Sequence, residues 1–242
     1  MKRFLLFVTG SLLLLSVAAQ PVSKALPQYN KGMEFLKTNM FPDAEICFKK
    51  AILLDKKYDS SYLQLARLYV TTTRLDSAAY YFKKVTTINP RNVIAQVEFG
   101  NFYRDVIQNF DTALIYYNNA LKLDSLNKVT FYSIAWCYNA KKEYEKAIPY
   151  AVKALELDNT YRPAYGELGH AYHYSKLFQA GVDQFKKNIA ISPTVDLPYF
   201  YAGMCYIQLN QKDAALSMYD GLQKINPKLA GSLKKNIDQM KD

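Results

Sequence analysis

Apolar and aromatic side chains in this chain recur in paired runs that repeat about every 34 residues. In the stretch that starts at Asp59, they fall at positions 4, 7, 8 and 11 of a first run and at positions 20, 24 and 27 of a second. At about 100° per residue, each set lies on one face of a helix. The pattern therefore predicts consecutive pairs of amphipathic helices.

The same spacing fits six consecutive rows, and only the third needs one inserted residue, before Ala113, to stay in register. Positions 8 and 20 carry small residues, which let two helices approach closely: Gly32, Ala66, Gly100, Ala135, Gly169, Gly203 and Ala44, Ala78, Ala113, Ala147, Gly181, Ala215. Acidic residues recur where each second helix begins, as suits a helix N-terminus: Asp43, Asp76, Asp111, Glu145 and Asp213. The predicted pairs cover residues 25–58, 59–92, 93–127, 128–161, 162–195 and 196–227.

These rows resemble the tetratricopeptide repeat, whose signature places Leu-Gly, Tyr, Ala, Phe and Pro at the same spacings. The resemblance covers residues 25–227 and implies an all-α fold, a right-handed α-solenoid of about six helix-turn-helix repeats. A solenoid of stacked hairpins needs a polar cap at its end. Leu229, Leu233 and Ile237 recur at helical spacing and predict a capping helix over residues 228–242.

The first nineteen residues have the features of a signal peptide. Lys2 and Arg3 precede an apolar run, and Val17-Ala18-Ala19 supplies small residues before an expected cleavage at Gln20. The run is shorter than the roughly 20 residues of a membrane-spanning helix. We therefore expect a periplasmic or secreted protein, with residues 20–24 as a short linker and no stable membrane insertion after cleavage. The alternative is a membrane anchor formed by the uncleaved segment.

The composition is that of a folded protein with a basic surface: 50% of the 242 residues are hydrophobic, 21% are charged and the formal net charge is +10. Such a balance suits nucleic acid, anionic membranes or acidic partners, or only a solvated lysine surface. The lysine pairs recur with the repeat, which favours a solvated outer face, and no nucleic-acid recognition motif is found. Three widely spaced cysteines, Cys47, Cys137 and Cys205, predict small residues at the edge of the core rather than a disulfide framework.

In proteins similar to this one, first-helix positions 2, 5, 9 and 12 line a concave groove that holds a partner segment. The resemblance implies the following groove residues: Arg67, Asn101, Arg104, Tyr132, Trp136, Asn139, His170 and His173. Polar and aromatic side chains together suit a peptide backbone with one or two anchors. The alternative is that many of these side chains pack between repeats. Tyr29 and Met33 replace the Lys and Asn of the family's carboxylate clamp, so that partner class is not expected.

No motif of enzyme chemistry stands out, since neither a Gly-rich phosphate loop nor a nucleophile elbow is present. Glu167, His170 and His173 follow at i, i+3 and i+6, but their directions around a helix diverge too far for one metal ion. The two histidines could instead make binding sensitive to pH. We expect a non-catalytic scaffold for a protein or peptide, without cofactor or metal. The alternatives are a stoichiometric structural subunit of a cell-envelope assembly or secretion complex, and a catalytic or carbohydrate-binding groove.

Overall fold

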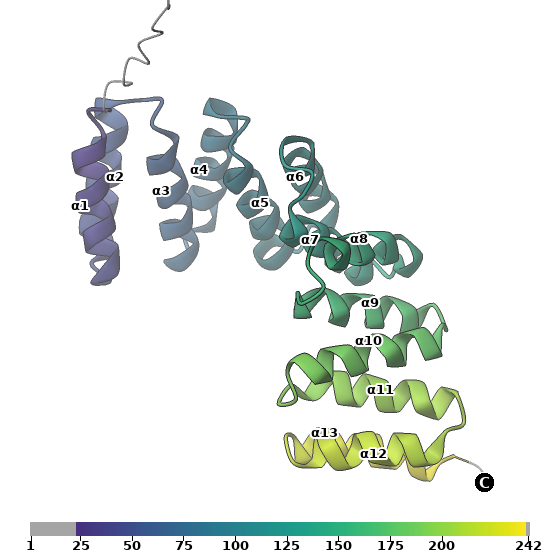
Figure 1. Cartoon of the computed structure of the whole chain (residues 1–242). Helices are drawn as coiled ribbons and strands as arrows, with labels where there is room; N and C mark the ends of the chain where they lie inside the picture. The colour runs from purple at the N-terminus through teal and green to yellow at the C-terminus, as the bar shows by residue number, and fades with distance from the viewer. Residues whose placement is uncertain (1–22, 241–242) are drawn as a thin grey trace, which may run out of the picture. The chain divides into compact units, whose positions relative to one another are not determined.

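The computed structural model describes residues 23–240, and within them every regular element is helical (Figure 1). The fold is an all-α solenoid of helical hairpins, as the sequence predicts. The elements are α1 (Leu26–Lys37), α2 (Phe41–Leu54), α3 (Asp59–Thr71), α4 (Leu75–Ile88), α5 (Val93–Asn101), η1 (Phe102–Ile107), α6 (Phe110–Leu123), α7 (Lys128–Ala140), α8 (Tyr144–Leu157), α9 (Arg162–Tyr174), α10 (Phe178–Ile191), α11 (Asp196–Gln208), α12 (Lys212–Gln223) and α13 (Pro227–Asp238).

The chain divides into two compact units at the boundary between Ser61 and Tyr62. In the first unit, α1 and α2 form one hairpin whose centre is the ring of Phe48, which is fully buried. A Cβ on Gly32 would lie 2.7 Å from that ring, so the absence of a side chain there sets how closely the two helices approach. Ser23 donates a 2.6 Å hydrogen bond to Asp55 and ties the start of α1 to the end of α2.

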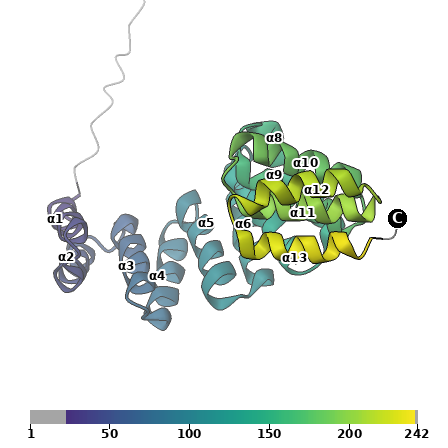
Figure 2. The same ribbon diagram turned by 90° about the horizontal axis from the view of Figure 1, so that it is seen from below.

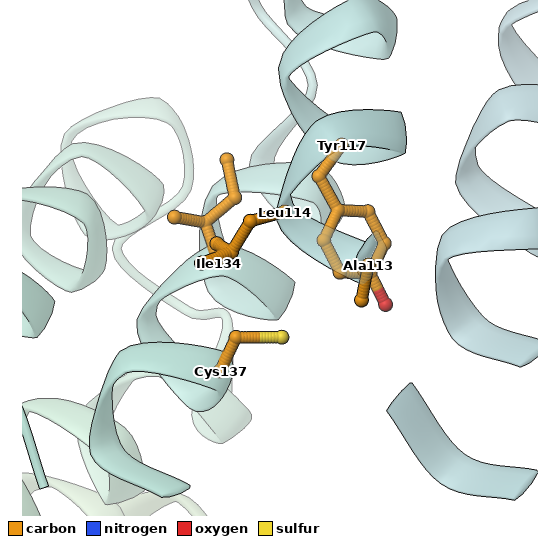
Figure 3. Packing of buried hydrophobic residues seen from close by; sticks show 5 residues of the cluster. All are labelled: Ala113, Leu114, Tyr117, Ile134 and Cys137. Atoms are coloured by element: carbon orange, nitrogen blue, oxygen red, sulfur yellow. The ribbon is translucent and has the colours of Figure 1, made fainter. Parts of the chain in front are cut away.

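In the second unit, the first helices α5 and α9 pack on their partners through the same small-against-aromatic contact. A Cβ on Gly100 would lie 2.6 Å from the Tyr117 ring, and one on Gly169 would lie 2.7 Å from the Phe185 ring. Tyr117 also belongs to a buried cluster between α6 and α7, together with Ala113, Leu114, Ile134 and Cys137 (Figure 3). The predicted spacing of small and aromatic positions is therefore the spacing of the core.

Each turn inside a hairpin contains one residue with a left-handed backbone: Asn39, Thr73, Gln108, Lys142, Lys176 and Asn210. These residues are 34 positions apart except between Thr73 and Gln108, where the distance is 35. The additional residue lies in η1, a six-residue π-helix that continues α5. A π-turn accommodates one extra residue inside a helix, so the insertion predicted in the third row widens the helix and leaves the turn intact.

The helix starts follow the electrostatic expectation. The acidic residues predicted at the start of the second helices lie in the first turn of α2, α4, α6, α8 and α12. There a negative charge faces the unpaired N–H groups of the helix end. Asn side chains cap four starts, those of α5, α6, α7 and α13, by accepting a hydrogen bond from the backbone N–H three residues on: Asn92, Asn109, Asn127 and Asn226.

The C-terminal helix α13 closes the array by covering α11 and α12, beside which it lies in both views (Figures 1 and 2). Leu233 and Ile237 are fully buried in a cluster with Leu222 of α12. A Cβ on Gly203 would lie 2.7 Å from the Leu233 side chain. Leu233 thus takes the place that an aromatic residue of the same hairpin occupies over Gly32, Gly100 and Gly169.

The predicted signal peptide, residues 1–19, and most of the predicted linker lie outside the described residues. Among residues 23–240, no helix has the length and apolar character needed to cross a membrane. The three cysteines are buried and free. Burial raises the pKa of the Cys137 and Cys205 thiols to about 12, which makes them inert packing residues.

Candidate binding site

The contacts between successive first helices follow one rule in the second unit. The sixth residue of each repeat lies against the ninth or twelfth residue of the repeat before it. The pairs are Glu98 with Arg67, Ser133 with Arg104, Glu167 with Asn139, and Tyr201 with His170 and His173. Position six was not among the positions that the family resemblance assigns to the groove, so the structure adds it to the surface under consideration.

A pocket of about 500 Å³ opens between α7, α9 and α11, and α10 contributes Phe185 and Asn188 to its lining. It brings together four of the predicted groove residues: Tyr132, Trp136, Asn139 and His170. Phe185 and Tyr201 add two further aromatic walls, and Glu167, Arg162 and Asn188 add polar groups. Such a combination of aromatic walls with a few polar groups is typical of a binding pocket.

Gly166 is the residue that opens this pocket. Position five carries a bulky side chain in every other repeat: Tyr29, Leu63, Val97, Tyr132 and Phe200. A Cβ on Gly166 would meet only the Asn188 side-chain nitrogen, at 3.4 Å. The missing side chain leaves a space beside Asn188 that a bulky residue would fill, and both residues line the pocket.

The polar wall of the pocket centres on Glu167. Asn139 Nδ2 donates to the Glu167 carboxylate at 2.8 Å and to its main-chain oxygen at 2.9 Å. Burial raises the pKa of Glu167, although the hydrogen bond from Asn139 and the charge of Arg104 act in the opposite direction. Both Asn139 and Asn188 are more than nine-tenths buried, and the Oδ1 atom of each has no hydrogen-bond partner among the described residues. These two oxygens are buried beneath the pocket wall, whereas the Asn188 atom nearest the space at Gly166 is the donor Nδ2.

Trp136 combines the two roles that the sequence left open. Its ring lines the pocket, and it also packs edge-on against Phe110, with 5.7 Å between ring centres. The guanidinium of Arg104 lies 5.2 Å from the indole centre. Although burial opposes the charge, hydrogen bonds to Asp105 raise the pKa of Arg104 and keep it cationic. The cationic guanidinium of Arg104 therefore packs against the indole ring of Trp136.

Arg67 and Asn101 line a separate pocket of about 360 Å³, between α3, α5 and η1. The Arg67 guanidinium is held there by Glu98, with Nε 2.7 Å from Oε2. Asn101 Oδ1 accepts a 2.7 Å hydrogen bond from the Tyr117 hydroxyl. Polar groups of these two residues are therefore engaged within the protein itself.

The two histidines lie in different surroundings. His170 faces the first pocket between Tyr174 and Tyr201, whereas His173 Nδ1 lies 3.2 Å from Cys205 Sγ and is not part of the pocket wall. Burial lowers the pKa of both, with a further contribution from His173 in the case of His170. The Glu167 carboxylate accepts a hydrogen bond from Asn139 of the preceding repeat. Within residues 23–240, no three His, Cys, Asp or Glu side chains gather as a metal site would require.

Comparison with known proteins gives the following matches. Models described as tetratricopeptide repeat match residues 59–92, 130–161 and 199–228. Anaphase-promoting complex subunit 3 of Schizosaccharomyces pombe is 24% identical over 210 residues, which are 87% of this chain but only 26% of that protein. This chain thus spans about a quarter of the length of that relative.

Two solved structures share the fold. The structure of YrrB, described as a TPR protein with an unusual peptide-binding site, matches 78% of this chain and 97% of its own, with a TM-score of 0.67 and 24% identity. That of PilW, described as a widely conserved type IV pilus biogenesis factor, matches 88% of this chain and 100% of its own, with a TM-score of 0.74 and 17% identity. At these identities, the matches establish the fold alone.

Proposed function

Since the chain contains tetratricopeptide repeats, we propose that it is a scaffold that binds a segment of a protein partner across α7, α9 and α11 and catalyses no reaction. The observation that carries this proposal is the pocket at Gly166, where the rings of Trp136, Phe185 and Tyr201 and the carboxylate of Glu167 line one space. A bound segment with N–H groups would add donors to the Glu167 carboxylate, which accepts from Asn139 within the protein.

The polar groups at the two pockets are engaged to different extents, and the difference favours the first pocket. Around the second pocket, the Arg67 guanidinium and the Asn101 amide oxygen bond within the protein. Around the first, the Glu167 carboxylate accepts from Asn139 but forms no ion pair within the described residues. The YrrB structure is described as having a peptide-binding site, which gives a precedent for this type of function on this fold.

We further propose that the protein is exported, on the strength of the charged start, short apolar run and small-residue site in residues 1–19. N-terminal sequencing of the purified native protein tests this proposal. A mature chain that begins at Gln20 agrees with cleavage, and an intact chain that starts at Met1 and is recovered with membranes favours the anchor.

A second candidate is a stoichiometric structural subunit of a cell-envelope assembly or secretion complex. Two matches favour it, because one relative is a subunit of a large complex and one similar structure is that of a pilus biogenesis factor. A subunit would be recovered from cross-linked native cells in one complex of fixed stoichiometry. A scaffold would be recovered mainly as free protein with exchangeable partners.

Selection from a library of random twelve-residue peptides tests the binding function directly. We expect enriched peptides to bind the purified protein, to change the emission of Trp136, the only tryptophan, and to lose at least tenfold in affinity with Trp136→Ala. Loss of one central aromatic anchor has an effect of this size. Peptides that bind the variant equally well would place the binding surface elsewhere.

A further inference from the structure

We propose that the pocket at Gly166 is a specificity pocket for an arginine side chain of the bound segment, whose guanidinium pairs with the carboxylate of Glu167. This inference rests on the proposed function and names the chemistry that the segment must carry. Three independent observations on α7, α9 and α10 support it.

The first observation is an internal comparison between equivalent carboxylates. Glu98 and Glu167 both occupy position six of their repeats. Glu98 receives a guanidinium from Arg67, which stands at position nine of the preceding repeat. The residue equivalent to Arg67 beside Glu167 is Trp136, and Glu167 forms no ion pair in the part of the chain that the structure describes. Of these two equivalent carboxylates, Glu98 forms an ion pair, whereas Glu167 has only the more distant charge of Arg104.

A second contact between successive first helices, which we call a seam, supports the same conclusion. Arg104, at position twelve, donates to Ser133 at position six of the next repeat, with 3.0 Å between Nη1 and Oγ. The residue equivalent to Arg104 beside Glu167 is Asn139, a neutral amide. Position six therefore receives a guanidinium from the chain in two successive seams, between repeats two and three and between repeats three and four. In the following seam, between repeats four and five, it receives only an amide.

The second observation is that two departures from the repeat occur together in repeat five. Position 27 is apolar in the other five repeats, as Ala51, Val85, Ala120, Ala154 and Leu222, but is Asn188 here. Position five is bulky in the other five repeats but is Gly166 here. The two meet, since a Cβ on Gly166 would contact the Asn188 amide. A buried amide and an unfilled space beside it both lower the stability of a fold. Such departures from the local rule are expected at functional sites.

The third observation is the match between the walls and a guanidinium. Arginine has five N–H donors in one plane and stacks on aromatic faces. The Glu167 carboxylate and the rings of Trp136 and Tyr201 line the same pocket, so both an acceptor pair and aromatic faces are present there. Burial removes water from the Glu167 carboxylate and raises its pKa. A guanidinium paired with the carboxylate would replace part of the lost hydration and stabilise the charged form. Lysine has three donors and no plane to stack, and fits this set less well.

Arg162 also lines the pocket, but it forms no ion pair with Glu167 among the described residues. It does not take the place of the missing cation in this structure. Its charge opposes a second cation brought close to it, so Arg162→Gln should bind an arginine probe at least as well as the wild type.

The test uses a minimal probe, N-acetyl-arginine methylamide, titrated into the purified full chain and followed by Trp136 emission and by amide NMR shifts. Its uncharged isostere, the citrulline derivative, is the matched ligand. We expect the arginine probe to bind with a Kd on the order of 1 mM, as a ligand of this size can reach. The citrulline probe should bind at least tenfold more weakly.

Two pocket variants and one matched control complete the experiment. Glu167→Gln should weaken the arginine probe at least tenfold, and Gly166→Val should abolish its binding by filling the pocket with a side chain of the size found at this position in repeat three. Glu98→Gln makes the same change on a carboxylate that is already paired, and should leave probe binding unchanged. Circular dichroism establishes that each variant is folded, and Glu167→Gln still decides the question if Gly166→Val is not.

Equal binding of the arginine and citrulline probes, or equal binding by wild type and Glu167→Gln, would overturn the proposal. The twelve-residue peptides selected for binding separate the two proposals. Peptides that bind at Trp136 but share no arginine contradict the arginine pocket and leave the scaffold function standing. Binding of the arginine probe without any peptide that binds at Trp136 contradicts the scaffold function and leaves the pocket chemistry standing.

Discussion

The side-chain Nδ2 of Asn139 donates hydrogen bonds to two oxygens of Glu167, the carboxylate Oε2 at 2.8 Å and the main-chain oxygen at 2.9 Å. Because Asn139 lies on α7 and Glu167 on α9, this pair joins the first helices of repeats four and five. It also fixes which way the Asn139 amide faces, since both neighbours accept. The Oδ1 atom is left unpaired as a consequence.

The Asn139 contact should contribute to stability. Asn139→Ala removes both hydrogen bonds, one of them to a carboxylate, and should lower the free energy of unfolding by about 1.5–3 kcal/mol. Urea denaturation followed by circular dichroism measures the change. Asn118→Ala, at an exposed position of α6, is the control and should have little effect. An equally small loss for Asn139→Ala would show that the two bonds contribute nothing net.

Glu167 should lower stability at neutral pH. Its raised pKa means that the folded state holds the proton more tightly than the unfolded state, so stability is lost as pH rises through the folded pKa. Glu167→Gln should therefore be more stable than wild type at pH 7, and this advantage should disappear below about pH 4, where both states of wild type are protonated. Urea midpoints between pH 3.5 and 8 measure this, and a constant difference across the range would contradict it.

The two histidines should make the folded state sensitive to acid. Burial lowers the pKa of His170 and His173, so the unfolded state binds protons more readily and stability falls as pH drops below about 6.5. His170→Gln with His173→Gln should flatten the stability profile between pH 6.5 and 5. A profile of the double variant that is as steep as that of wild type would assign the acid sensitivity to other groups.

Trp136 should report a half-buried site. Its ring lines the pocket but packs on Phe110 and Arg104, so its emission should lie between those of buried and exposed indoles, with partial quenching by acrylamide. Trp136→Ala should cost about 3–5 kcal/mol of stability through the cavity it leaves, besides weakening the segment. Full quenching with no loss of stability would show that the ring does not pack in the protein.

Among the turn residues with a left-handed backbone, Thr73 has the side chain least suited to that conformation. Its φ is 57°, and a β-branched side chain is strained at positive φ. Thr73→Gly should raise the free energy of unfolding by about 1 kcal/mol, measurable as a higher Tm. Asn210→Gly at the equivalent turn is the control and should change little, because asparagine tolerates this conformation. A lower Tm for Thr73→Gly would mean that chain entropy outweighs the strain.

Removal of α13 should expose the end of the array. Truncation before Pro227 uncovers Leu222 and Gly203, which Leu233 and Ile237 now cover. The truncated chain should melt at a lower temperature and aggregate, because an apolar face of a repeat becomes exposed. A chain ending at Asp238 keeps the helix and serves as the control. Equal solubility and heat stability of the two chains would contradict the capping role.

Much of this protein was determined by sequence alone, because the period of apolar residues is a local property. The helix pairs, the small-against-aromatic contacts and the acidic helix starts all follow from positions within one repeat. Even the irregular third row was visible as one additional residue before Ala113. The form it takes, a π-helix that leaves the turn at Gln108 intact, needed the backbone.

The sequence alone determined the residues of the candidate site only in part. The sequence placed Tyr132, Trp136, Asn139 and His170 on one surface, and the structure brings these four to one pocket while Arg67 and Asn101 lie at another. It did not show that Glu98 forms an ion pair while Glu167, among the described residues, forms none, because such contacts join residues about 30 positions apart on neighbouring helices. The departures at Gly166 and Asn188 can be read from the rows, but their meeting cannot. Hydropathy along one helix fixes which face is buried, whereas the contacts across a seam depend on how two helices pack, and only the tertiary structure decides that.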